Sequence, residues 1–286
     1  MQKQIHNQYE STLHKQILKV CHRIELNHHD NLKGPKIYTN YQRVGLIVLF
    51  VRSRKSLRDF ISEIYESKWP VWLGMKDIPG KSTLHRWLRK WDVPWIRQIV
   101  FETTDEPEIM AIDATGLDSW QRSRHYERRI GAAYMPYVKV DILVDTKTKL
   151  VHDFVIRMKP RHDVLGAKTI FHRIRYKGKL LLADRGYDSE PLHELCRKNG
   201  NLMFAPIRDF NVPRPKGVNR RRCKEAHEMK GMRSIVECVI RSLKSRIFSL
   251  RSRLHYMKKR EFAWHIVAYN LQKRLIPFRF YWIFGT

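Results

Sequence analysis

Glu108-Ile-Met-Ala-Ile-Asp113 and Lys179-Leu-Leu-Leu-Ala-Asp184 decide the fold of this chain, because each is a short apolar run that closes on an aspartate. Runs of this length predict buried strands. An aspartate at the end of a strand is most often a turn residue or a helix cap, so neither residue alone points to chemistry. In α/β sheets, however, functional groups gather at the carboxyl ends of strands, which makes Asp113 and Asp184 candidate site residues.

The pattern around these two runs predicts a mixed α/β sheet with helices against it. Stretches that alternate or are rich in β-branched residues predict strands at residues 137–144, 150–158 and 202–205. A polar turn at residues 145–149 makes the first two of these an antiparallel hairpin. Helical spacing predicts helices at residues 164–174, 190–198, about 230–250 and about 258–274.

A polar stretch with a proline, Thr103-Thr-Asp-Glu-Pro-Glu108, predicts the main domain boundary. We expect an all-α domain over residues 1–105 and an α/β domain over residues 106–275. The second domain carries a short insertion at about 206–229 that is rich in Pro, Arg and Lys, and residues 276–286 are expected to form a C-terminal tail.

The N-terminal domain contains a possible helix-turn-helix. Helical spacing covers residues 16–26 and 42–66, with Ser56 as the predicted N-cap of a helix. Residues 78–92 then predict a Pro/Gly turn, a cap at Ser82 or Thr83, and a short basic helix. An ordinary helical hairpin with a charged outer face gives the same pattern. The candidate DNA-binding residues on this helix are Lys81, Arg86, Arg89 and Lys90.

The charge of the chain favours a polyanionic partner. The 286 residues carry 56 Lys+Arg against 28 Asp+Glu, a net charge of +28. Residues 205–260 contribute 17 basic and 4 acidic side chains, so this segment is the most basic. No apolar run approaches the roughly 20 residues that span a bilayer, so we expect no membrane partner. The four cysteines show no CxxC pairing, which argues against a zinc ribbon and favours the cytoplasm.

Glu237 lies in the predicted helix of this basic segment. Val236, Ile240, Leu243 and Ile247 have the spacing of its buried face, which Leu250 continues. The next face carries Glu237 together with three cations, Arg233, Arg241 and Lys244. A solvated ladder of charge pairs would have this pattern. A lone glutamate among cations also suits a metal ligand with phosphate-binding neighbours, since carboxylates bridge the two Mg²⁺ ions that serve phosphodiester cleavage.

The three acidic residues and their neighbours resemble a known family, the DDE transposases of insertion sequences, of the broad IS4/IS5 kind. The matching features, in order, are Asp113, Asp184-Arg-Gly-Tyr-Asp188 and Arg233-Ser-Ile-Val-Glu237-x6-Lys244. In that family the glutamate lies in a motif of the form Y-x2-R-x3-E-x6-K. Here Lys230 occupies the tyrosine position, so the resemblance does not define the subgroup.

The resemblance implies an RNase H-like fold and a metal site made by Asp113, Asp184 and Glu237. It implies Mg²⁺ as cofactor, with two ions and Mn²⁺ as a substitute. It also implies cleavage at element ends, strand transfer into target DNA, and a homodimer assembled on that DNA. Arg233, Lys244, Arg241 and Arg185 would contact phosphates near the scissile bond. The expected location is the cytoplasm, in association with the nucleoid.

Three alternatives remain open on the sequence. A stand-alone metal-dependent nuclease of the same fold would cut DNA without joining it. A catalytically inactive, transposase-derived protein would bind DNA without cutting it. A basic RNA-binding structural protein would leave the three acidic residues unexplained.

Overall fold

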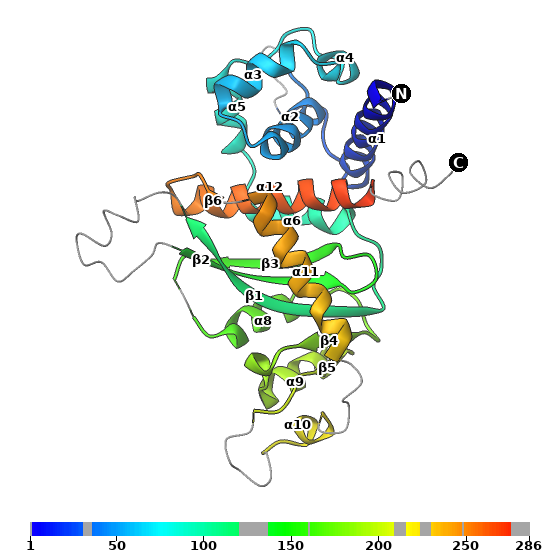
Figure 1. Ribbon diagram of the computed structural model, residues 1–286, viewed down its shortest axis with the longest axis vertical. Helices are drawn as coiled ribbons and strands as arrows, with labels where there is room; N and C mark the ends of the chain where they lie inside the picture. Colours follow the sequence, from blue (N-terminus) through cyan, green and yellow to red (C-terminus); the bar gives the residue numbers. More distant parts are fainter. Residues whose placement is uncertain are drawn as a thin grey trace, which may run out of the picture. The chain divides into compact units, whose positions relative to one another are not determined.

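The computed structural model describes residues 2–30, 36–119, 137–159, 161–208, 216–223, 230–247 and 249–275. The chain divides into two compact units, and each is described by itself. Unit 1 comprises Met1–Thr103 and Leu254–Thr286, and unit 2 comprises Thr104–Arg253. Figure 1 labels the elements of both units. Within the described residues, no helix is both long and apolar enough to cross a membrane.

Unit 1 is helical, as the sequence predicts. Ser56 is the N-cap of α3, and its side chain accepts a hydrogen bond of 3.2 Å from the Asp59 backbone N–H, as expected. The helix α5 begins one residue before the predicted caps, with Gly80 at its N-cap, and a short helix that the sequence did not predict lies between α3 and α5. The helices are α1 (Gln2–Arg23), α2 (Asn40–Ser53), α3 (Leu57–Tyr65), α4 (Trp69–Trp72), α5 (Lys81–Leu88), α6 (Val93–Glu102) and α12 (His255–Arg274).

Two helices, α2 and α12, form the centre of unit 1. Every residue from Val44 to Leu49 is buried in α2, because this helix is apolar all round and is covered on all sides. The helix α12 packs against α6 and α2. Asn270 donates a 2.8 Å hydrogen bond to the Thr103 hydroxyl, and Arg274 donates one of 2.6 Å to the Thr103 carbonyl. The predicted division placed this helix in the second domain, whereas its packing groups it with the first unit.

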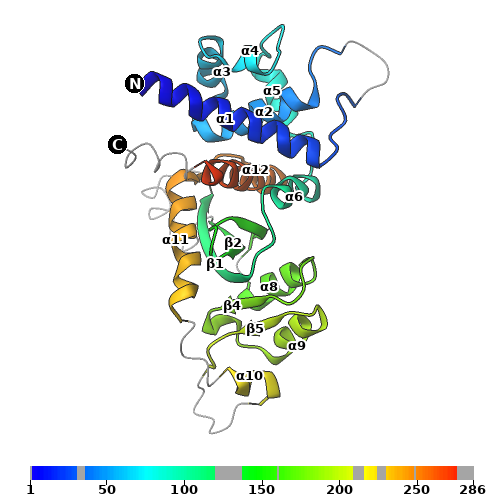
Figure 2. The same cartoon turned by 90° about the vertical axis from the view of Figure 1, so that its right-hand side faces the viewer.

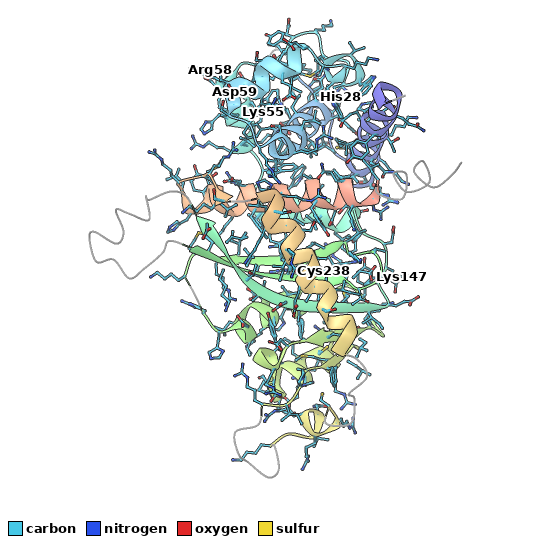
Figure 3. The ribbon with its side chains drawn as sticks, in the orientation of Figure 1. His28, Lys55, Arg58, Asp59, Lys147 and Cys238 are labelled. Atoms are coloured by element: carbon cyan, nitrogen blue, oxygen red, sulfur yellow. The ribbon has the colours of Figure 1, made fainter. Side chains whose placement is uncertain are left out.

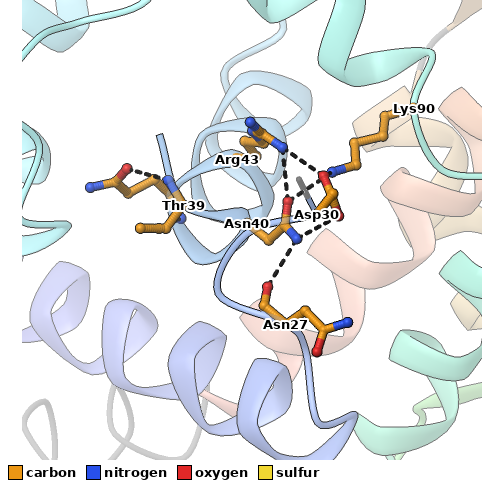
Figure 4. A network of polar contacts seen from close by, with 7 residues as sticks. Asn27, Asp30, Thr39, Asn40, Arg43 and Lys90 are labelled. Atoms are coloured by element: carbon orange, nitrogen blue, oxygen red, sulfur yellow. Dashed lines mark hydrogen bonds and ion pairs between the residues drawn. The ribbon is translucent and has the colours of Figure 1, made fainter. Parts of the chain in front are cut away.

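A polar network joins the start of α2 to the end of α5 (Figure 4). The Asn40 side chain donates to the Asn27 carbonyl at 2.9 Å and to Asp30 at 2.8 Å. Lys90 donates a 2.8 Å hydrogen bond to Asn40 and forms an ion pair with Asp30. Arg43 completes the network with a 2.9 Å ion pair to Asp30. This network fixes the chain between α1 and α2 against the rest of the unit.

Unit 2 is built on a mixed sheet of strand order β3-β2-β1-β4-β5, and β6 also pairs with β1. The first three strands are antiparallel neighbours, whereas β1, β4 and β5 run parallel to one another. The mixed sheet, together with the helices that flank it, confirms the predicted α/β fold class. The strands are β1 (Ile109–Ser119), β2 (Tyr137–Asp145), β3 (Val151–Arg157), β4 (Leu180–Ala183), β5 (Leu202–Phe204) and β6 (Ser249–Leu250).

Helices cover both faces of the sheet, and Figure 2 shows α11 (Lys230–Ile247) on one side with α8 (Asp163–Phe171) and α9 (Glu190–Lys198) on the other. On the α8 side, Met110, Ile112, Leu181 and Ala183 pack in one apolar core with buried residues of both helices. On the opposite side, α11 packs against β1, β2 and β4. Side chains alternate between the faces along each strand, so a residue next to a core residue faces α11.

Two elements of unit 2 differ from the sequence prediction. The strand β1 continues six residues beyond Asp113, because residues 110–118 pair with β2 along their whole length. The predicted basic insertion at 206–229 contains a short helix, α10 (Val218–Arg222), among its described residues. Its other residues at 209–215 and 224–229 lie outside the described part, as does the predicted tail at 276–286.

Candidate active site

Asp113 and Asp184 occupy equivalent positions on neighbouring strands. The strands β1 and β4 are parallel and pair in the register Ile112 with Ala183, so the two aspartates are the next residue on each strand. Neighbouring strands are about 4.8 Å apart. The sheet thus brings together two carboxylate residues that are 71 positions apart in sequence, counted from 113 to 184.

Both aspartates belong to the α11 side of the sheet. Ile112 and Ala183 lie in the core on the α8 side, and Asp184 keeps an extended backbone with φ −76° and ψ 166°. Alternation along the strands therefore places both aspartates on the opposite face. Asp113 and Asp184 are both half-buried. The Asp113 Oδ1 accepts a 2.7 Å hydrogen bond from the Ala114 backbone N–H.

Glu237 lies on the helix that covers this face. Val236, Val239, Leu243 and Ile247 are the buried residues of α11, whereas Ile240, predicted to be buried, is only half-buried. Leu250 is buried but belongs to β6. Glu237, Arg241 and Lys244 are all exposed, as the spacing predicts. Cys238, the residue after Glu237, is an exposed free cysteine of α11 and is labelled in Figure 3.

Two of the three predicted metal ligands, Asp113 and Asp184, have positions that suit a hard divalent cation. Asp113 and Asp184 supply carboxylate oxygens, which Mg²⁺ prefers, from equivalent positions on two adjacent parallel strands, Asp113 within β1 and Asp184 directly after β4. No group of three or more His, Cys, Asp or Glu side chains in the described part of the chain lies close enough to hold a metal ion. The strand pair therefore fits a metal, while the contribution of Glu237 stays a prediction.

The turn that follows Asp184 is held by arginines from residues 206–222. Arg185, Gly186 and Tyr187 form a 3-10 turn whose N-cap is Asp184, and Arg185 is exposed. The carbonyls of this turn accept hydrogen bonds from Arg208. The sequence predicts Asp188 or Ser189 as the N-cap of α9, and Ser189 takes that position, whereas Asp188 forms an ion pair with Arg220.

A buried charged cluster on the α8 side was not predicted. Asp141 of β2 is fully buried and forms a 2.6 Å ion pair with Arg157. Burial raises the pKa of Asp141 to about 6, against the opposing effect of Arg157. Gly166 of α8 lies directly on this carboxylate, and a β-carbon there would overlap it. An aspartate between Val140 and Ile142 in an apolar strand was the one signal in the sequence.

Tyr187 is a buried residue whose pKa depends on acidic residues of both faces of the sheet, Asp141 and Asp113. Its side chain is 1% exposed, and its hydroxyl has no hydrogen-bond partner among the described residues. Burial raises the pKa of Tyr187, and the negative charges of Asp141, Asp113 and Asp163 act in the same direction. Tyr187 therefore lies on the core side of the sheet, close enough to Asp113 for the charge of that residue to act on its pKa.

The predicted basic helix of unit 1 presents an exposed charged face. Leu84 and Trp87 are buried in α5, while Lys81, Arg86 and Arg89 are exposed. Lys90 differs from them, because its ammonium is held by Asp30 and Asn40 and burial lowers its pKa to about 8. Three of the four predicted residues are therefore accessible to a ligand.

A mixed sheet with aspartates at equivalent positions on two adjacent parallel strands offers a candidate site for a divalent cation. Residues 104–271 match the family model of the transposase DDE domain, and the chain belongs to this family. The IS4/IS5 subgroup is not specifically indicated by this match.

Comparison with solved structures gave a similarity to the cryo-EM structure of a piggyBac transposase synaptic complex with hairpin DNA. The identity is 13%, the TM-score is 0.45, and the match covers 92% of this chain and 72% of that chain. This similarity is too distant to carry an argument about the site. The search of curated proteins found no match.

Proposed function

We propose that this member of the DDE transposase family cleaves DNA at the ends of an insertion sequence and joins the freed ends to target DNA. The observation that carries the proposal is the register of β1 and β4, which puts Asp113 and Asp184 side by side on the face that α11 covers. Glu237 on α11 is the third proposed residue, in agreement with its spacing from Arg233 and Lys244.

Each residue has a defined role in this proposal. Asp113, Asp184 and Glu237 would hold Mg²⁺, with two ions as the expected number and Mn²⁺ as a substitute. When bound, such ions activate the attacking water or hydroxyl and stabilise the leaving oxygen. Arg241 and Lys244, which are exposed on the same helix as Glu237, would bind phosphates next to the scissile bond. Arg185, exposed directly after Asp184, would do the same, as would Arg233.

The helical unit would recognise the element ends. The exposed side chains of Lys81, Arg86 and Arg89 on α5 support this role, because a short basic helix can bind phosphates or enter the major groove. Cutting two ends and joining both to a target requires two copies of the chain, so we expect a homodimer on DNA. The overall charge of +28 predicts binding that weakens steeply with salt.

The test is a cleavage and strand-transfer assay on DNA that carries the flanking element end. Wild type, Glu237→Gln and the control Glu194→Gln are compared in Mg²⁺, in Mn²⁺ and in EDTA. Glu194 is exposed on α9, which lies on the other side of the sheet, so the control removes the same charge elsewhere. The expected result is metal-dependent nicking and joined products for wild type and the control, both lost in Glu237→Gln.

Other outcomes of this assay would favour one of the alternative functions. Nicking without joined products would assign a stand-alone nuclease. Binding without nicking in either metal would assign an inactive DNA-binding derivative. Full activity of Glu237→Gln would remove Glu237 from the site, and Asp113→Asn and Asp184→Asn would then test the two aspartates.

A further inference from the structure

The segment after β5 returns to the turn that follows Asp184. Arg208 donates from Nε to the Arg185 carbonyl at 2.7 Å and from its guanidinium to the Gly186 carbonyl at 2.5 Å. Its backbone N–H also donates to Asp188 at 2.8 Å. Three hydrogen bonds from one residue thus cross the turn between Asp184 and Asp188. Since β4 and β5 are parallel neighbours, both segments leave the same edge of the sheet.

Asp188 is held from a second direction by α10. Its side chain is fully buried, and Arg220 donates to both of its carboxylate oxygens, at 2.6 Å and 2.5 Å. A guanidinium that binds a carboxylate through two parallel hydrogen bonds fixes geometry as well as energy. The buried ion pair therefore ties the end of the turn to a helix that lies 32 residues further along the chain.

The helix α10 is itself anchored. The Glu190 carboxylate accepts hydrogen bonds of 3.0 Å from the backbone N–H groups of both Asn219 and Arg220, at the start of α10. Burial alone would raise the pKa of Glu190, but the hydrogen bonds from Asn219 and Arg220 lower it overall. Gly217 adopts φ 103°, and a β-carbon there would overlap Glu190. Arg220 is thereby presented to Asp188 by a fixed helix.

We infer that Arg208 and the Arg220–Asp188 pair are positioning residues that fix the turn after Asp184 and, through it, the carboxylate of Asp184. This inference rests on the proposed role of Asp184 as a metal ligand. The predicted basic insertion thus has a second task besides carrying charge, because two of its arginines bind the protein itself. A residue that orients a metal ligand changes metal affinity about tenfold or more when it is removed.

The test measures the turn and the metal separately, without DNA, on the full chain. Wild type, Arg208→Ala, Arg220→Gln and the control Arg222→Ala are compared by hydrogen exchange and by Mn²⁺ binding. Arg222 is an exposed residue of the same helix, so its removal matches the charge change without touching the turn. Asp184→Asn is the reference for metal binding, and thermal unfolding checks that each variant folds.

We expect Arg208→Ala and Arg220→Gln to exchange faster at residues 184–188 and to bind Mn²⁺ about tenfold more weakly, with Arg222→Ala unchanged in both respects. Arg208→Ala keeps its backbone hydrogen bond to Asp188 and is the milder variant should Arg220→Gln not fold. Unchanged exchange and Mn²⁺ affinity within twofold of wild type in Arg208→Ala would overturn the inference.

The two proposals fail differently. Equal Mn²⁺ binding by wild type and Asp184→Asn would remove Asp184 as a ligand and so count against the proposed function. Faster exchange of residues 184–188 in Arg208→Ala would still establish that this arginine holds the turn. Hydrogen exchange at residues 184–188 that is as slow in Arg208→Ala as in wild type would refute the inference that Arg208 fixes the turn, whatever the Mn²⁺ affinity.

Discussion

The two faces of the unit 2 sheet differ in how deeply their acidic residues are buried. On the α11 face, Asp113 and Asp184 are half-buried at equivalent positions of two parallel strands, Asp113 within β1 and Asp184 directly after β4. On the α8 face, Asp141 is fully buried beneath a helix and paired with Arg157. Asp113 pairs in register with Ile142, so Asp141 is the partner of the next residue, Ala114. One step along a strand therefore changes the face on which an aspartate lies.

This difference separates two half-buried carboxylates on the α11 face from one that is fully buried and paired within the protein. Asp141 is covered by Gly166 and bound by Arg157, so no ligand can reach it without displacing α8. Asp113 and Asp184 are only half-buried on the face that α11 covers. Substitutions on the two faces should therefore affect different measurements, activity on one and stability on the other.

The largest expected effect is on cleavage by Asp184→Asn. This change keeps the shape of the side chain but removes the charge that would hold a cation, so cleavage should fall about a thousandfold or more, which is about 4 kcal/mol in the barrier. The free energy of unfolding should change by less than about 1 kcal/mol, since the residue is half-buried. Nicking assays and chemical denaturation measure the two quantities.

If Asp184→Asn unfolds the protein or keeps full cleavage activity, the proposed difference between the two faces of the sheet is wrong. Asp113→Asn should behave in the same way, because it occupies the equivalent position in the register. A variant that loses both activity and several kcal/mol of stability would make Asp184 a structural residue like Asp141.

Arg157→Met should cause the largest loss of stability. The change removes one partner of a buried ion pair and leaves the Asp141 carboxylate, which is 0% exposed, without its cation. Breaking such a pair destabilises a protein by about 3 kcal/mol or more. Lys55→Met is the matched control, since it breaks the exposed pair with Glu63 at 2.9 Å and should cost less than about 1 kcal/mol. Equal losses in urea denaturation would contradict the contrast.

Gly166→Ala should destabilise unit 2 by about 2 kcal/mol, because the added β-carbon overlaps the Asp141 carboxylate and forces α8 away from β2. Gly186→Ala is the control. A β-carbon at Gly186 would lie 3.5 Å from Asp163 and 3.7 Å from Arg208, which is ordinary contact. Denaturation midpoints of the two variants test the difference, and a tolerated Gly166→Ala would show that α8 can shift at little cost.

Much of unit 2 could be predicted because its signals are local. The apolar runs before Asp113 and Asp184 mark buried strands, and the spacing around Glu237 marks the exposed side of α11. These features depend on periodicity and on neighbours in sequence. The mixed α/β fold class followed from the sequence of these elements and the RNase H-like class from the resemblance, whereas the order of the strands in the sheet was not predicted.

The features that escaped prediction depend on partners far away in sequence. Asp141 reads as a single polar residue in a strand, and only α8 shows that it is buried. Asp188 reads as a helix cap, and its real partner is Arg220, 32 residues away. The helix α12 follows α11 in sequence, yet its buried side chains belong to the core of unit 1. Local patterns cannot distinguish such partners.

The smallest expected effect is a change of the free energy of unfolding with pH, and the group that we expect to titrate is Asp141. Burial raises its pKa to about 6 from 3.8, so the folded protein binds a proton that the unfolded chain releases between these values. The stabilising contribution is therefore present at low pH and is lost as pH rises through about 6. Between pH 7 and pH 5, wild type should gain about 1 kcal/mol relative to Asp141→Asn, which cannot titrate.

Ile170→Val controls for loss of stability alone, because it removes core volume without removing an ionisable group. Its stability difference from wild type should stay constant between pH 7 and pH 5, whereas that of Asp141→Asn should change. A constant difference for Asp141→Asn would mean that Arg157 keeps the carboxylate ionised throughout this range. The pH series thus decides whether burial or the ion pair controls the charge of Asp141, and so how far the two faces of the sheet differ.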